Sequence, residues 1–133
     1  MSAWNYPVYT ALPPVASAIA AGNCVILKPS ELSPSTSNVL KSLFEKYLDK
    51  DCYQVIEGKA EIAAKITTYP FDLIIYTGSP EKGNISINLF PLSFLNNYYF
   101  IRAYHFFIFL LLNPNHLTIL RKEVPDLFEN NFF

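Results

Sequence analysis

Lys28 and Glu31 are the first residues along the chain whose types and spacing suit ligand binding. They follow the apolar run 24–27, which is typical of a buried parallel strand. Pro29 ends that strand, because proline removes a backbone donor. In open α/β sheets, ligands bind beyond the carboxyl ends of the strands. A lysine and a carboxylate at this position therefore predict a nucleotide site.

The sequence 77–79, Thr-Gly-Ser, is the second candidate site, and it also follows an apolar run. Backbone N–H groups and a hydroxyl at a helix start can bind pyrophosphate, and Pro80 suits a first helical turn. Gly83 completes the glycine spacing of a P-loop, but Asn84 and Ile85 replace its lysine and its hydroxyl residue. No two glycines are separated by a single residue, so the G-x-G-x-x-G motif is absent. A nucleoside triphosphatase is disfavoured, and Gly/Ser turns of this kind also occur without a ligand.

Alternating apolar runs and helical patterns surround these two sites. Strands are expected at 24–28, 53–57 and 71–76, and helices at 14–21, 34–48 and 60–67. Ser33 is expected to cap the second helix. Its apolar stripe, expected to face the core, comprises Val39, Leu40, Leu43, Phe44, Tyr47 and Leu48. Short connections between strands and helices predict an α/β fold: a truncated Rossmann-like parallel sheet of three strands with flanking helices.

Composition restricts the class of protein further. The 133 residues are 51% apolar with a mean hydropathy of +0.20, enough for one domain with a core. A net charge of -1 predicts no binding to nucleic acid. Cys24 and Cys52 are far apart in the sequence and match no metal spacing, so we expect a buried, hydrophobic Cys24 and an inert, half-buried or surface Cys52. Nothing near Met1 resembles a signal peptide, and a cytoplasmic location is expected.

Four motifs occur in one order: Trp4-Asn5-Tyr6-Pro7, Gly22-Asn23, Leu27-Lys28-Pro29-Ser30-Glu31, and Tyr76-Thr77-Gly78-Ser79 with Gly83. Together they closely resemble the aldehyde dehydrogenase superfamily. The segments 20–23, 28–31 and 47–51 look most like its class 3, fatty-aldehyde-type branch. The resemblance covers residues 3–84. It implies that residues 1–84 are part of an NAD(P)-binding domain.

The resemblance implies a role for each matching residue. Asn5 would be the oxyanion-hole amide, and Trp4 would line the pocket beside it. Lys28 and Glu31 would bind the adenosine ribose, with Ser30 in the same motif, and the carboxylate favours NAD, with NADP as the second choice. The implied pyrophosphate site comprises Gly78, Ser79 and Gly83. Without the family pattern, Lys28 is simply a strand-end lysine, Glu31 a capping acid and Asn5 a turn residue.

Residues 85–133 do not continue the resemblance and form a divergent tail with no recognisable domain. No glycine follows Gly83 and no cysteine follows Cys52, so the family's nucleophilic cysteine and general-base glutamate are not matched. We therefore expect NAD(P)-dependent aldehyde oxidation to carboxylic acids by descent, in a fragment that is inactive alone. A translated intron or a shifted reading frame would account for the tail. The homodimer of the family is doubtful here, and an aldehyde is the expected substrate.

Two alternatives to a dehydrogenase fragment remain. One is a non-catalytic remnant that binds nucleotide weakly. The other is a small membrane-associated protein that uses residues 98–112. The longest apolar run in that segment, 106–112, is shorter than the roughly 20 residues of a spanning helix, so membrane association is the weaker prediction.

Overall fold

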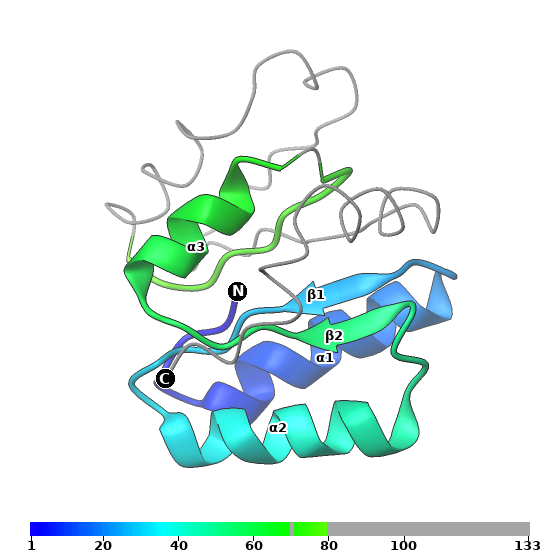
Figure 1. Ribbon diagram of the computed structural model, residues 1–133, viewed down its shortest axis with the longest axis horizontal. Helices are drawn as coiled ribbons and strands as arrows, with labels where there is room; N and C mark the ends of the chain where they lie inside the picture. Colours follow the sequence, from blue (N-terminus) through cyan, green and yellow to red (C-terminus); the bar gives the residue numbers. More distant parts are fainter. Residues whose placement is uncertain (70, 80–133) are drawn as a thin grey trace.

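The computed structural model describes residues 1–69 and 71–79. Its elements are α1 (Pro7–Ala20), β1 (Val25–Leu27), α2 (Pro34–Tyr47), β2 (Tyr53–Val55) and α3 (Ala60–Thr67). The two strands pair in parallel, with Val25 opposite Tyr53 and Leu27 opposite Val55. Helices α1 and α2 cover one face of the sheet and α3 lies on the other (Figure 1). The predicted α/β, Rossmann-like class is confirmed.

The alternation of side chains along β1 divides the core into two clusters, one on each face of the sheet. Val25 and Leu27 face the helices α1 and α2, whereas Ile26 faces α3. The α1–α2 cluster contains Ala11, Val15, Ala18, Val25, Leu27, Leu40 and Phe44. The α3 cluster contains Cys24, Ile26, Ile56, Ile66, Phe71 and Ile74. A strand that is buried on both faces fits the continuous apolar run in the sequence.

Helix α1 is longer than the sequence indicated, because it begins at Pro7 and not at Pro14. Pro7 occupies the first turn, where its missing N–H costs nothing. Pro13 and Pro14 lie inside the helix. The hydroxyl of Ser17 donates to the Pro13 carbonyl over 3.0 Å, one turn earlier in the helix. At the other end Gly22 has φ 74°, so the predicted left-handed glycine stop is confirmed.

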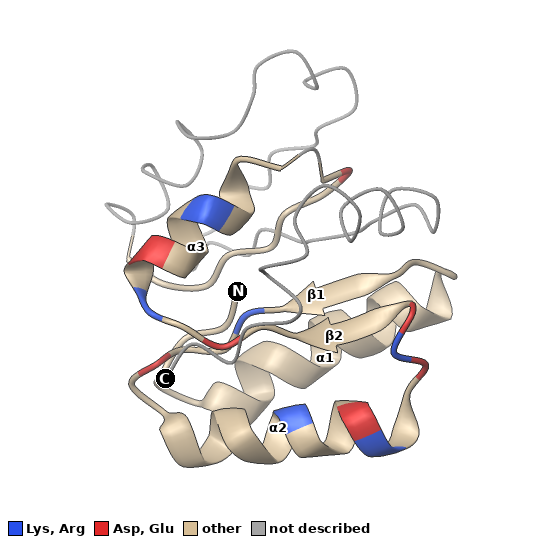
Figure 2. Ribbon diagram, viewed as in Figure 1, with Lys and Arg blue, Asp and Glu red and all other residues tan. Residues whose placement is uncertain are grey.

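Helix α2 begins after Ser33 as predicted, but the predicted capping bond is wrong. The Ser33 hydroxyl donates to the Trp4 carbonyl at 3.2 Å and so ties the start of α2 to the start of the chain. Of the predicted stripe, Leu40 and Phe44 are buried, whereas Val39, Leu43 and Tyr47 are exposed. The buried positions of α2 are Ser37, Leu40 and Phe44, which are three and four residues apart and so share one face of the helix. Figure 2 shows that α2 carries both positively and negatively charged residues.

The predicted third strand, 71–76, is not assigned as a strand in the described residues. The Met1 amino group donates to the Ile75 carbonyl at 2.7 Å, and Thr77 N–H donates to the Met1 carbonyl at 3.1 Å. Ser2 N–H donates to the Lys28 carbonyl at 3.1 Å. Residues 1 and 2 therefore lie between the end of β1 and residues 75–77. These few hydrogen bonds hold residues 75–77 in place, but they do not form a ladder long enough to be assigned as a strand.

The Met1 amino group is buried in this arrangement. Burial first, and then the nearby charge of Lys28, lower its pKa to about 5.

Several predictions concern residues outside those described: Gly83, the helix expected from Pro80, and the tail 85–133 with its possible membrane segment 98–112. Among residues 1–69 and 71–79, no helix is long and apolar enough to cross a membrane.

Candidate cofactor site

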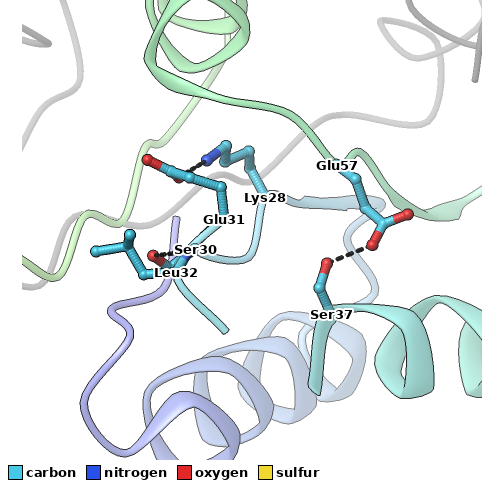
Figure 3. A network of polar contacts seen from close by, with 6 residues as sticks. All are labelled: Lys28, Ser30, Glu31, Leu32, Ser37 and Glu57. Atoms are coloured by element: carbon cyan, nitrogen blue, oxygen red, sulfur yellow. Dashed lines mark hydrogen bonds and ion pairs between the residues drawn. The ribbon is translucent and has the colours of Figure 1, made fainter. Parts of the chain in front are cut away.

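The turn after β1 brings Lys28 and Glu31 together. Pro29 is buried at the strand end, and Ser30 closes the turn that follows. Its carbonyl accepts from Ser33 N–H at 3.1 Å, and its hydroxyl accepts from Leu32 N–H at 3.3 Å. This turn directs Glu31 back toward the strand, so that Lys28 Nζ lies 2.9 Å from Glu31 Oε2 (Figure 3).

The two partners differ in exposure. The Lys28 side chain is only 6% exposed, whereas that of Glu31 is 39% exposed. Burial alone raises the pKa of Glu31, but the hydrogen bond and charge of Lys28, a backbone hydrogen bond and the charge of Lys59 outweigh it and lower the pKa below its usual value. The carboxylate is therefore ionised at neutral pH, and its outer side is open to an incoming hydroxyl.

The Gly78–Ser79 turn lies beside this pair. Burial raises the pKa of Tyr76, a hydrogen bond with the Ser79 side chain opposes that shift, and the charge of Glu31 adds to it. Tyr76 is thus close enough to interact with both residues. A Cβ at Gly78 would collide with the Tyr76 hydroxyl, so a larger residue there would displace the Tyr76 side chain. The structure therefore brings the second sequence site to the first.

Two buried hydroxyls near this edge lack a hydrogen-bond partner within the described residues. They are Ser2 Oγ and Thr77 Oγ1. The two residues are held by neighbouring backbone bonds, because Ser2 N–H donates to the Lys28 carbonyl and Thr77 N–H donates to the Met1 carbonyl. Buried polar atoms are normally satisfied by protein, water or ligand. These hydroxyls are thus able to take a polar partner at the edge where Lys28 emerges.

Trp4 and Asn5 lie in the bend that precedes α1, and the Trp4 carbonyl accepts from the Ser33 hydroxyl. Both are exposed, and the exposed fraction of Trp4 is 61%. Tyr6, the next residue, has φ 56°, a left-handed conformation that is uncommon for an aromatic residue. Thr10 fixes the bend, because its Oγ1 accepts from Ala3 N–H at 3.2 Å. Asn5 is therefore presented to solvent by a defined turn.

Sequence reasoning missed a polar network at the end of β2. Ser37 Oγ donates to Glu57 Oε1 at 2.6 Å, and Lys41 Nζ lies 3.6 Å from Glu57 Oε2. Figure 3 shows the Ser37–Glu57 contact next to the Lys28–Glu31 pair. The position of Glu57 at the end of a strand was a usable signal, but Ser37 looks like an ordinary helix residue. In the part of the chain that is described, no group of three or more His, Cys, Asp or Glu residues could hold a metal.

Comparison with known proteins gives a consistent result. Residues 1–88 match the model of the aldehyde dehydrogenase family. A mouse protein, aldehyde dehydrogenase family 3 member B3, is 49% identical over 82 residues, which are 62% of this chain and 17% of the relative. The bovine family 3 member B1 is 44% identical over 85 residues, covering 64% of this chain and 18% of the relative. An aldehyde dehydrogenase of the plant Craterostigma plantagineum is 44% identical over 88 residues, covering 66% and 18%.

The relatives from animals and a plant match the same part of this chain, its first 80 to 90 residues. The predicted likeness to the class 3 branch is confirmed by the family 3 relatives. The chain spans 17–18% of the length of these relatives. Because the family match covers well over half of its residues, this chain belongs to the aldehyde dehydrogenase family.

Proposed function

We propose that residues 1–84 hold the adenosine ribose and pyrophosphate of NAD(P), as part of an enzyme that oxidises aldehydes to carboxylic acids. The observation that carries this proposal is the Lys28–Glu31 pair, 2.9 Å apart at the carboxyl end of β1. That end of a parallel strand is where α/β sheets bind nucleotides. The turn that contains Gly78 and Ser79 lies beside it through Tyr76.

The chemistry of the pair fits a ribose. An ionised carboxylate only accepts hydrogen bonds, and an ammonium only donates them. Glu31 is exposed enough to accept from a ribose hydroxyl, while the buried Lys28 keeps the carboxylate in place and donates to a ribose oxygen. A second negative charge, on a 2′-phosphate, would be repelled by Glu31. This supports NAD over NADP as the preferred cofactor.

The buried hydroxyls of Ser2 and Thr77 provide an independent test of fit. Both lack a partner in the described residues and stand at the strand end where the Gly78–Ser79 turn begins. A polar ligand at this edge would satisfy such groups, directly or through water. When bound, NAD supplies the acceptor for a hydride. The residues described here bind and orient its adenosine side.

The complete reaction requires more than this site. Asn5, by family resemblance, contributes an amide that stabilises the developing oxyanion of an aldehyde adduct. Its exposed position in the bend before α1 is compatible with that role. No cysteine follows Cys52 in the sequence, and a thiolate nucleophile is needed to form the adduct. We therefore expect the chain alone to bind cofactor without turning over aldehyde.

Binding is tested by titrating NAD into the purified chain by calorimetry, beside a double variant, Lys28→Ala with Glu31→Ala. The matched control is Glu45→Ala with Lys46→Ala, which removes the same two charges from exposed positions on α2. The expected result is that the first double variant loses measurable binding and the control does not. Equal binding by all three proteins would overturn the site.

Turnover is tested separately by following NADH formation with a medium-chain aldehyde. We expect no rate above that of a blank without protein. A rate that disappears in Asn5→Ala would contradict the proposed inactivity and would support the oxyanion role. This result leaves the binding test unaffected, so the two parts of the proposal can fail independently.

A further inference from the structure

Cys24 and Cys52 are distant in the sequence but are neighbours in the sheet. Val25 pairs with Tyr53, so one residue earlier Cys24 stands opposite Cys52. The hydrogen bond from Val25 N–H to the Cys52 carbonyl, 2.8 Å long, fixes this register. Cys52 N–H in turn donates to the Asp49 carbonyl at 3.1 Å, which holds the turn before β2. The expected burial of Cys24 and partial burial of Cys52 are both confirmed, and the pairing of the strands also makes the two residues neighbours.

The two side chains point to the same face of the sheet. Cys24 is a member of the α3 cluster, and Cys52 packs against that cluster. The thiols are close enough for a hydrogen bond between them. Neighbouring strands lie about 4.8 Å apart, and disulfides join residues whose Cα atoms are roughly 4.4–6.8 Å apart. A bond between the sulfurs therefore requires rotation of side chains and no rearrangement of the strands.

We propose that Cys24 and Cys52 are a redox-active pair that forms a reversible disulfide between β1 and β2. The oxidant is a small-molecule disulfide of the glutathione class. In the first step one cysteine thiolate attacks the oxidant, forms a mixed disulfide and releases one thiolate of the oxidant. In the second step the other cysteine loses its proton to solvent, attacks the mixed disulfide and releases the second thiolate. Two protein thiols are oxidised and one small disulfide is reduced to two thiols.

Burial determines which cysteine reacts first. Cys52 is half-buried, whereas Cys24 is 1% exposed. Burial, followed by the hydrogen bond and charge of Cys52 and the charge of Asp49, raises the pKa of Cys24 to about 12. Because the thiolate is the attacking species, Cys24 is a poor partner for a dissolved oxidant. Cys52 therefore attacks the oxidant first and carries the mixed disulfide, and Cys24 then attacks that mixed disulfide from within the core.

The disulfide would join the two strands at the end opposite the candidate cofactor site. Cys24 precedes β1, whereas Lys28 follows it. The loop closed by the bond contains β1, the turn with Glu31 and all of α2. Oxidation therefore constrains the scaffold that carries the ribose pair without modifying a residue of that pair.

The test is oxidation of the intact chain with mixtures of oxidised and reduced glutathione, followed by acid quenching and mass spectrometry. The expected product has lost two hydrogens, carries no glutathione and yields one linked peptide with Cys24 and Cys52. Reduction should restore the starting mass. The equilibrium constant for oxidation should be about 10- to 100-fold larger in native buffer than in concentrated guanidinium chloride, because the fold holds the thiols together.

Two variants sharpen this test. Cys24→Ser should accumulate glutathione on Cys52, and Cys52→Ser should remain unmodified because Cys24 is buried. The unchanged chain provides a result even if a variant fails to fold. Glutathione that stays on Cys52 in the unchanged chain, covalent dimers, or equal equilibrium constants in native and denaturing buffer would each overturn the proposal.

Discussion

The ends of the two strands carry a similar set of charges in opposite arrangements. After β1, the buried Lys28 contacts one oxygen of Glu31, whose side chain remains 39% exposed. After β2, both oxygens of Glu57 are engaged by α2: Ser37 donates to one at 2.6 Å, and Lys41 lies 3.6 Å from the other. Glu31 is therefore held by one lysine and remains partly open to solvent, whereas both carboxylate oxygens of Glu57 are bound by residues of α2.

This difference separates the proposed binding group, Glu31, from a structural one, Glu57. Glu31 has a fixed position and free acceptor capacity, which is what recognition of a hydroxyl requires. Glu57 uses its acceptors to join the end of β2 to α2, which packs on that strand. A carboxylate at the end of a parallel strand is therefore not by itself a ligand-binding residue. What its oxygens already contact decides the assignment.

The largest expected effect is on cofactor affinity, from Glu31→Gln. Hydrogen bonds to charged groups contribute about 1.5–3 kcal/mol, so the affinity for NAD should fall about 10- to 100-fold. The loss for NADP should be smaller, because the repulsive charge is also removed. Calorimetric titration with both cofactors measures this. An unchanged ratio of the two affinities would assign the carboxylate no part in cofactor choice.

Glu57→Gln should lower the stability of the fold and leave the affinity for NAD nearly unchanged. Ser37 is buried and would keep only a neutral acceptor, so we expect the free energy of unfolding to fall by about 1–2 kcal/mol. The affinity for NAD should change less than about threefold, because the group lies outside the proposed ribose contact. Urea unfolding and the same titration measure the two quantities. If the Glu57→Gln protein were as stable as the unchanged chain but did not bind NAD, Glu57 would be the binding residue and our assignment of the two strand ends would be reversed.

The pH dependence of binding should follow the lowered pKa of Glu31. Its folded pKa lies below the usual value of 4.5. Protonation is therefore delayed on acidification, and the stability that the Lys28–Glu31 pair provides is present above pH 4.5. It is lost only as the pH falls through the lowered folded pKa. We expect NAD affinity to be level from pH 7 to pH 5, as measured by fluorescence or calorimetry, whereas a decline centred above pH 5 would show that the pair is not ionised as described.

The smallest effect is expected at Lys41→Met, which removes the charge and keeps the apolar stem. Both partners of the Lys41–Glu57 pair are about one-third exposed, and such pairs contribute about 0–1 kcal/mol. The loss of unfolding free energy should decrease as salt is added, because the pair is screened. A loss as large as that of Glu57→Gln would mean that the ammonium, and not Ser37, holds the carboxylate.

Patterns within a few consecutive residues predicted the features of the fold that neighbouring residues determine. The apolar run before Lys28, the start of α2 after Ser33 and the left-handed Gly22 are all determined within a few residues of chain. The Lys28–Glu31 contact belongs to this group, because the two residues are three positions apart. The resemblance to a known family then assigned these residues a ligand that the local pattern alone left open.

The errors arose where distant segments decide the outcome. Pro13 and Pro14 indicated a later start for α1, but packing of Ala11 and Ala18 on the sheet maintains a longer helix. The 71–76 run has a strand-like composition, yet within the described residues it forms an isolated bridge at Leu73 and a backbone bond from Met1 to Ile75 rather than an assigned strand. The Ser37–Glu57 bond and the proximity of Cys24 to Cys52 arise from the parallel pairing of β1 with β2, which no local window contains.

The place of residues 1 and 2 also has a consequence for the order of events during synthesis. Their backbone partners are Lys28 on one side and Ile75 and Thr77 on the other. At about 5–20 residues per second, roughly 2–10 s separate the synthesis of these two sides. Residues 1 and 2 are thus among the last of the described residues to acquire all their neighbours. A nascent chain can complete the α1–α2 cluster before Ile66 and Phe71 are synthesised. Until then, Cys24 and Ile26 on the other face of β1 lack these packing partners.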